Sequence, residues 1–461
     1  MIRLIRFLLL CGTGLFAAPA AFAGLLDPSF ANEGVRVLDF SATPGASGEE
    51  RGVVNCAAAG GKQLVVASDD YFGLVVTRLN FDGSVDTGFG VAGTRVHAMA
   101  AGNLLGPHTG AVCRADGGIW IVTTQFVPNA NWRIRLIALD ADGLLVPGGA
   151  FGPHGHADIE IPAPGSLFVR QALGFNQAPD GRAFATGFVE TSANQYSPWL
   201  IALEADGDLQ GVSVFRPQGI NGSIVATAAG VGPGGGIWVA GSGEGPGALR
   251  AAFRAYFDPA TLALVHAETF ALAGQSIDVA GGSMVRHGVM VVGAARRTPG
   301  APASPMLLVM RTEGQITMLD LPSPAPMEDG GHTGISAAGQ PISSLQGGRV
   351  LYGIGAEAWS ASMFQGYKGW YFARAVIGAS AAGDQVDTSF GDGGQAVLSV
   401  RSGETDCDGL LNTQTHARAG IWLGRPTVIG WWSRHCDPQQ EWDGLLMRLE
   451  PDDAIFADGF E

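Results

Sequence analysis

The chain has 461 residues, a formal net charge of −15 at pH 7 and only 15% charged residues. A chain of this length exceeds most single compact cores, so we expect several domains or a repeat array. Its acidic charge repels phosphate backbones, which argues against nucleic acid as a partner.

Residues 1–23 predict a cleaved secretory signal peptide. Two arginines precede an apolar run, and Ala21-Phe22-Ala23 has the small-x-small pattern of a cleavage site. A transmembrane anchor is the alternative interpretation, but the run is short and is interrupted by Gly and Pro. No later segment holds about 18 uninterrupted apolar residues, so we expect no membrane span.

After residue 23, the sequence repeats one unit made of a turn and a strand. It reads LDPSFANEGVRV at 26–37, VDTGFGVAGTRV at 85–96 and VDTSFGDGGQAV at 386–397. An apolar strand and a second turn belong to the same repeat, with turn positions at Asp82, Asp142, Asp206, Asp258, Glu313, Ala382 and Asp452. These turns recur every 50 to 70 residues or so, a period typical of stacked or radial repeats.

A second marker lies upstream in each period, where glycine precedes a run rich in Val, Ile and Leu. Trp120, Trp238 and Trp422 are placed at the same point of their copies. A tryptophan can form a ligand platform, but three at one repeat position are better explained as core residues. No segment carries a sustained helical period with caps at both ends.

These units predict an all-β fold, a seven-bladed β-propeller over residues 24–453. Short strands bounded by Gly, Asp and Pro, with Asp-Gly turns, are typical of such sheets. The chain begins with the linking strand and stops after the turn of the seventh unit. We therefore expect the N-terminal strand, near residues 33–39, to pair with the last blade near 445–450 and to close the ring.

The three repeated words resemble the delta-60 repeat of exported bacterial proteins. The pattern of that family is roughly D-G-x-x-D-x-S-F-G-x-x-G-x-x, and three copies here match it well. The linkers at 143–161 and 207–222 match this pattern only in part, and the linkers after Asp258 and Glu313 do not contain it. The resemblance implies a propeller-like repeat and brings no catalytic residues to carry over.

One segment suggests a metal site. GPHGHADIEIP places His154, His156, Asp158 and Glu160 at alternate positions, and alternate side chains share one face of a strand. The same alternation is also typical of a solvated strand face. We therefore predict no metal and no cofactor, with His154, His156 and Asp158 as the weak candidates.

Aromatic residues concentrate in the long insertions of the sixth and seventh units, which we expect to be loops. They are Trp359, Phe364, Tyr367, Trp431 and Trp432. Binding residues often lie on loops, and Trp and Tyr offer a large contact area for a glycan or a protein surface. Some aromatic residues of these insertions are ordinary strand residues, as Trp370 is expected to be.

Four cysteines remain after processing, and an even number in an exported chain indicates disulfides. Cys56 and Cys113 occupy equivalent places in adjacent units, so a bridge would join blade one to blade two. Cys407 and Cys436 both belong to the seventh unit and form the second predicted bridge. The sequence nominates no base that would activate a catalytic thiol.

The sequence favours a monomeric binding or surface-interaction protein with a protein or glycan ligand at the loops of blades six and seven. The alternatives are a propeller hydrolase or lyase acting on an extracellular sugar or lactone at the channel mouth, and a structural surface repeat. We expect export to the periplasm, cell surface or medium of a Gram-negative bacterium. Residues 454–461 are either a sorting tail or a frayed strand end.

Overall fold

The computed structural model describes residues 26–449 apart from 32–33, 39–49, 70–72, 99–103, 128–130, 163–169, 193–194, 246–248, 286–288, 300, 302, 312–314, 324–331, 336–339, 344–348, 360–365, 392, 400–417, 423–424 and 434–441. The predicted signal peptide and C-terminal tail lie outside the described residues. Among the residues described, no helix is long and apolar enough to cross a membrane.

The described residues form an all-β structure in which every sheet is antiparallel. The helical elements among them are short 3-10 turns: η2 (Ala59–Gly61), η3 (Gly149–Phe151), η4 (Pro233–Gly235) and η7 (Ala381–Gly383). Runs rich in Val, Ile and Ala form the strands because such side chains pack well on a pleated surface.

The strands of the described residues group into seven sheets, numbered here in chain order. Sheet 1 contains β2 (Glu50–Ala58), β3 (Lys62–Asp69), β4 (Gly73–Leu79) and β5 (Thr94–Ala98). Sheet 2 contains β6 (Leu104–Cys113), β7 (Ile119–Val127), β8 (Asn131–Leu139) and β9 (His156–Ile159). Sheet 3 contains β10 (Arg170–Gln177), β11 (Ala183–Ser192), β12 (Gln195–Leu203) and β13 (Leu209–Val214).

Sheet 4 contains β14 (Asn221–Val231), β15 (Ile237–Glu244), β16 (Arg250–Phe257) and β17 (Leu264–Phe270). Sheet 5 contains β18 (Ser276–Val285), β19 (Val289–Arg297), β20 (Ser304–Met310) and β21 (Ile316–Asp320). Sheet 6 contains β22 (His332–Ile335), β23 (Gln340–Ser343), β24 (Arg349–Trp359), β25 (Gly366–Val376), β26 (Gln385–Val386) and β27 (Gln395–Ser399). Sheet 7 contains β28 (Arg418–Trp422), β29 (Arg425–Ser433), β30 (Trp442–Arg448) and, from the N-terminal part of the chain, β1 (Val35–Leu38).

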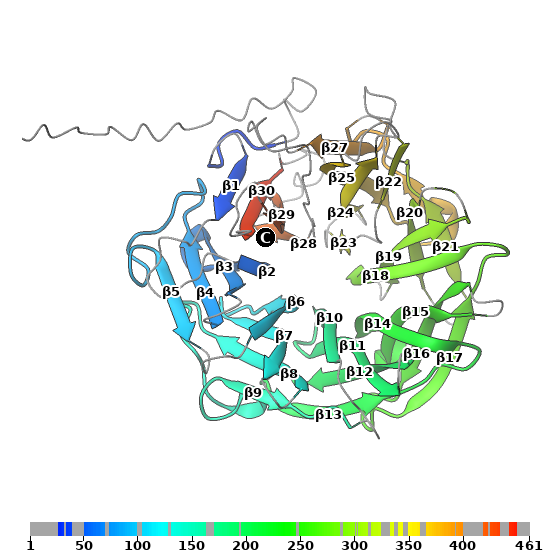
Figure 1. Ribbon diagram of the computed structural model, residues 1–461, viewed down its shortest axis with the longest axis horizontal. Helices are drawn as coiled ribbons and strands as arrows, with labels where there is room; N and C mark the ends of the chain where they lie inside the picture. The colour runs from blue at the N-terminus through cyan, green and yellow to red at the C-terminus, as the bar shows by residue number, and fades with distance from the viewer. Residues whose placement is uncertain are drawn as a thin grey trace, which may run out of the picture.

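The sheets follow one another around a common centre in the order of the chain (Figure 1). Nearest that centre lie β2, β6, β10, β14, β18, β23 and β28, each of which contacts the next. Strand β2 of sheet 1 also contacts β28 and β29 of sheet 7. Strand β1 pairs with β30 in the register Val35 to Met447, which is the pairing that the sequence predicts for the N-terminal strand.

The core is divided into apolar clusters that lie between neighbouring sheets. Ile121 of β7 packs with Leu64 of β3 between sheets 1 and 2, and Trp199 of β12 packs in the cluster between sheets 2 and 3. Because strand side chains alternate between two faces, each sheet contributes to the cluster on either side of it. Packing between sheets, rather than one central core, therefore stabilises the fold.

The repeated motif D-x-S-F binds an arginine of the third strand of a sheet, and we call this set of contacts the latch. The Asp27 carboxylate accepts hydrogen bonds from Ser29 N and Oγ, and it pairs with Arg448 Nε at 2.7 Å. The Phe30 ring lies 4.5 Å below the Arg448 guanidinium carbon. Aspartate, serine and phenylalanine are thus all used to hold one arginine.

The other two well-conserved copies repeat these contacts. Arg78 pairs with Asp86 at 2.7 Å and lies over Phe89, and Arg374 pairs with Asp387 at 2.8 Å. In the degenerate copy of sheet 2, Ala138 takes the place of the arginine, yet the backbone bond from Val146 N to Ala138 O remains. The backbone turn therefore forms in sheet 2 even though the ion pair is absent there.

The phenylalanines of two latches, Phe30 and Phe89, also pack against the turn of the following sheet. A Cβ atom on Gly83 would lie 2.7 Å from Phe30, and one on Gly143 would lie 2.7 Å from Phe89. Both glycines have positive φ, at +80° and +67°. The glycine of the Asp-Gly turn is required both by its backbone conformation and by this close approach.

The tryptophan alignment is confirmed at two positions and wrong at the third. Trp120 and Trp238 lie at the second residue of second strands, β7 and β15, and are 4% and 3% exposed, as core residues should be. Trp422 instead ends β28, the first strand of its sheet. The second strand of this sheet is the segment that follows, β29. The glycine-led motif around Trp422 therefore lies one strand earlier than the sequence predicts.

Candidate functional site

The predicted aromatic residues lie mainly in strands rather than in loops. Trp359 is the last residue of β24 and pairs with Gly366, while Tyr367 of β25 pairs with Ala358. Their assignment to a loop was therefore wrong. Aromatic residues have a high propensity for strands, so an aromatic-rich insertion extends a hairpin instead of interrupting it.

The same correction applies to the seventh unit. Trp431 and Trp432 belong to β29, where they pair with Gly444 and Asp443 of β30. Strand β28 pairs only with residues 425–429 of β29, so the two tryptophans follow the stretch that β28 covers. Phe364 lies outside the described residues.

These four residues occupy one kind of position in two neighbouring sheets. Both hairpins join the second strand of a sheet to its third, and β24 contacts β28 of the next sheet. We call this end of each sheet the 2–3 end. We call the opposite end the turn end, because the turns from the first strand to the second and from the third strand to the fourth lie there. The two hairpins thus lie at the same end of neighbouring sheets.

The four candidate metal ligands do not assemble into a site. Among the residues described, no group of three or more His, Cys, Asp or Glu side chains is placed to hold a metal ion. The rings of His154 and His156 are 6.3 Å apart, and Glu160 follows the end of β9. Asp158 is engaged by two arginines, so its oxygens already have cationic partners.

Asp158 forms the first of two clusters in which two arginines share one carboxylate. Arg133 Nη1 lies 3.0 Å from Asp158 Oδ2, and Arg135 Nη2 lies 2.7 Å from Asp158 Oδ1. Burial alone would raise the pKa of Asp158, but the hydrogen bonds from Arg135 and Arg133 outweigh it and lower that pKa. The carboxylate stays ionised and pairs with both guanidinium groups.

The second cluster joins sheets 4 and 5 at their 2–3 ends. Arg250 Nε lies 2.5 Å from Asp278 Oδ1, and Arg297 Nε lies 3.1 Å from Asp278 Oδ2. Arg250 also donates to Ser242 Oγ, which accepts from the backbone N–H of Val279 in the neighbouring sheet. The side chains of Arg250 and Arg297 are 33% and 42% exposed, so solvent and ligands reach both.

The turn end carries charges of both signs, because Arg114 and Arg182 pair with Asp116 and Asp180. Exposed aspartates line its turns: Asp82, Asp116, Asp142, Asp180, Asp206 and Asp208. Several accept a hydrogen bond from the backbone N–H two residues on, as Asp82 does from Ser84. Bonds from the Ser84 hydroxyl and backbone lower the pKa of Asp82, so it is ionised at neutral pH.

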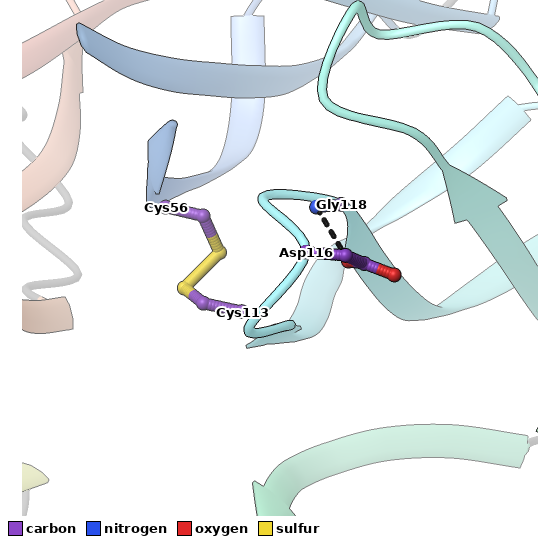
Figure 2. The surroundings of a disulfide bond; sticks show 4 residues. All are labelled: Cys56, Cys113, Asp116 and Gly118. Carbon is purple, nitrogen blue, oxygen red and sulfur yellow. Dashed lines mark hydrogen bonds between the residues drawn. A yellow bond between two sulfur atoms is a disulfide. The ribbon is translucent and has the colours of Figure 1, made fainter. Parts of the chain in front are cut away.

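Of the two predicted disulfides, the Cys56–Cys113 bridge is present (Figure 2). It joins β2 and β6, the first strands of sheets 1 and 2, with a Cα–Cα distance of 5.2 Å. Beside it, Asp116 accepts a hydrogen bond of 3.0 Å from Gly118 N in the turn that follows β6. Cys407 and Cys436 lie outside the described residues.

The arginine clusters could not be predicted from the sequence, for a physical reason. Arg250 and Asp278 lie in different sheets and meet only when the sheets pack, so no local pattern links them. The sequence did hold one signal: in the alternation Arg133-Ile134-Arg135, the arginines share one face of a strand. Pairing that face with Asp158 requires the register of β8 with β9.

No family model matches the chain, and no curated protein matches it. Among solved structures, it is similar to a protein of unknown function from Dyadobacter fermentans at 13% identity, with a TM-score of 0.44. That alignment covers 90% of this chain and 100% of the other.

Two further similar structures are enzymes. An ancestral GH74 enzyme aligns at 12% identity and a TM-score of 0.44 over 87% of this chain and 48% of its own. An exo-1,5-alpha-L-arabinanase from a bovine ruminal metagenomic library aligns at 12% identity and a TM-score of 0.36, over 76% of this chain and 95% of its own.

Proposed function

We propose that the protein is an exported, closed seven-bladed propeller that binds a glycan or protein ligand at the 2–3 ends of sheets 6 and 7. The pairing of β1 with β30 and the contact of β2 with β28 support a closed ring. The Cys56–Cys113 disulfide supports export, since disulfides persist in oxidising compartments.

One observation carries the proposed binding site. Trp359 and Tyr367 come from one hairpin and Trp431 and Trp432 from the next, and both hairpins are second-to-third-strand connections. Four large aromatic residues are thereby concentrated at one end of two neighbouring sheets. Aromatic side chains bind with a large contact area and little loss of rotamer entropy, which suits recognition of sugars and protein surfaces.

The experiment compares a double variant with a matched control. A glycan array probed with the mature protein identifies ligands, and Trp431→Ala combined with Trp432→Ala is expected to abolish their binding. Tyr196→Ala is the control, because Tyr196 also lies beside a second-to-third-strand hairpin, but in sheet 3. Equal binding by the double variant and the control would overturn the proposed site.

The competing function is that of an enzyme. The glycans identified on the array also distinguish catalysis from binding alone. A hydrolase or lyase would release new reducing ends or unsaturated products from a bound glycan during prolonged incubation. Binding without product formation supports the proposed role. Turnover that survives in the tryptophan double variant would place the activity elsewhere on the molecule.

A further inference from the structure

The N-terminal segment, residues 26–38, binds to sheet 7 as a separate peptide would. Asp27 and its partner Arg448 are 421 positions apart in the sequence, and their contacts are noncovalent. Asp27 N donates to Arg448 O at 2.9 Å, and Arg448 N donates to Gly34 O at 3.0 Å. Strand β1 then lies beside β30 (Figure 1), and Phe30 is fully buried. The segment therefore occupies a binding site on the last strand of the chain.

The latch of sheet 6 indicates that these contacts depend on the D-x-S-F motif and not on how the motif is linked to its sheet. Arg374 pairs with Asp387 at 2.8 Å and donates to Ser389, which follows it by 15 positions. In sheet 7 the corresponding contacts are made by Asp27 and Ser29, from the other end of the chain. The same side chains thus recognise the motif in a local and in a distant connection. A motif on another molecule meets the same requirements.

The interface between sheets 7 and 1, which the segment helps to fill, contains a buried amide without a partner. Gln63 of β3 is 0% exposed, and among the residues described neither its Nε2 nor its Oε1 has a hydrogen-bond partner. Because alternate side chains share one face of a strand, Gln63 lies on the face of Val65, which packs with Phe30 and Leu446. A buried amide without partners is costly, and it regains hydrogen bonds to water when the interface opens. Gln63 therefore makes this interface easier to open than one of apolar side chains alone.

From these observations we infer that two copies of the chain exchange their N-terminal segments, residues 26–38, each of which binds to sheet 7 of the other copy. Exchange replaces every contact of the segment by the same contact with a second copy, so no interface is lost. A second copy is the partner because its segment carries the motif and the strand Val35–Leu38 in the order that the site accepts. The internal copies of the motif are already bound to Arg78 and Arg374. The inference is independent of the proposed ligand, and it replaces the predicted monomer with a dimer.

A fluorescent peptide of residues 26–38 tests the site, with binding followed by fluorescence anisotropy. The full mature chain with Asp27→Ala should bind this peptide about a hundredfold more tightly than the wild type does, because its own segment has lost a buried ion pair. Asp86→Ala is the matched control, since it removes the aspartate of the sheet 1 latch and leaves the Asp27–Arg448 pair intact. This control should bind the peptide as weakly as the wild type. The same peptide carrying Asp27→Ala should not bind to any of the three chains.

A second measurement uses the wild type, so it does not depend on the folding of the Asp27→Ala chain. Two populations of the mature chain with different affinity tags are mixed, and dimers that carry both tags are quantified over time. We expect mixed dimers whose share rises with protein concentration. Exchange should be at least about fivefold slower in Gln63→Leu, which replaces the unpaired amide with an apolar side chain of similar size. Wild-type chains that stay monomeric and never form mixed dimers would overturn the inference, as would a peptide that binds Asp86→Ala as tightly as Asp27→Ala.

Discussion

Arg448 Nε donates a 2.7 Å hydrogen bond to Asp27 Oδ2, although the two residues are 421 positions apart in the sequence. Their side chains are 0% and 2% exposed, so the pair is removed from water. Arg448 also donates to the backbone oxygen of Phe81 in sheet 1. One arginine thus connects the N-terminal segment, the last sheet and the first.

Removing Asp27 should destabilise the protein more than removing an exposed aspartate. Asp27→Ala leaves Arg448 buried without its carboxylate, and breaking one side of a buried pair costs about 3–5 kcal/mol. Asp116→Ala is the control, because Asp116 pairs with Arg114 at 62% exposure and such pairs contribute about 1 kcal/mol or less. Urea denaturation followed by tryptophan fluorescence measures both. Equal losses would show that the Asp27–Arg448 pair does not hold the ends together.

Reduction of the Cys56–Cys113 disulfide should lower the stability of the protein by about 2–4 kcal/mol. The bridge spans a sequence separation of 57 residues, so it restricts the unfolded chain considerably. The variant with both Cys56→Ala and Cys113→Ala should have a lower thermal midpoint than the oxidised wild type, and once reduced it should match the reduced wild type. A further drop when that variant is itself reduced would report the predicted Cys407–Cys436 bridge. An unchanged midpoint in the double variant would contradict the first prediction.

The fold was predictable because its determinants are local. The Asp-Gly turns and the apolar runs between them each specify a hairpin within a few residues, and the repetition multiplies that signal. The unit that was misaligned, near Trp422, has a short first strand in β28. In the other units a glycine directly precedes the second strand, whereas in this unit the corresponding glycine lies within the first strand.

The candidate site was harder to predict because its contacts join separate sheets. Trp431 was recognised as a binding candidate, but its place in β29 depends on pairing with Gly444 of β30. Arg250 and Asp278 gave no signal, because their contact requires sheets 4 and 5 to pack. Residue type suggested the chemistry, whereas the partners were set by tertiary structure.

Acid should weaken the latch of sheet 1 within a definite pH range. Hydrogen bonds from Lys62 and then Arg78 hold the pKa of Asp86 at about 2, below its ordinary value of 3.8. A carboxylate with a depressed pKa stabilises the folded state above its unfolded pKa, and this contribution is lost as the pH falls through the folded value. The stability difference between the wild type and Asp86→Asn should therefore be constant above about pH 5 and shrink between about pH 4 and pH 2. A difference that stays constant down to pH 2 would show that Asp86 does not titrate with folding.

Glycines in the first strands should not tolerate a methyl group, because neighbouring sheets approach most closely there. A Cβ atom on Gly174 of β10 would lie 2.2 Å from the backbone oxygen of Thr227 in β14, and one on Gly110 of β6 would lie 2.6 Å from Phe175 Cβ. Backbone cannot rotate away as a side chain can, so Gly174→Ala should lower the free energy of unfolding by about 1–3 kcal/mol. Gly236→Ala is the matched control, since its nearest neighbour would be 3.7 Å away. Guanidinium denaturation compares the two, and a Gly174→Ala variant as stable as Gly236→Ala would mean that sheets 3 and 4 pack less closely than this contact requires.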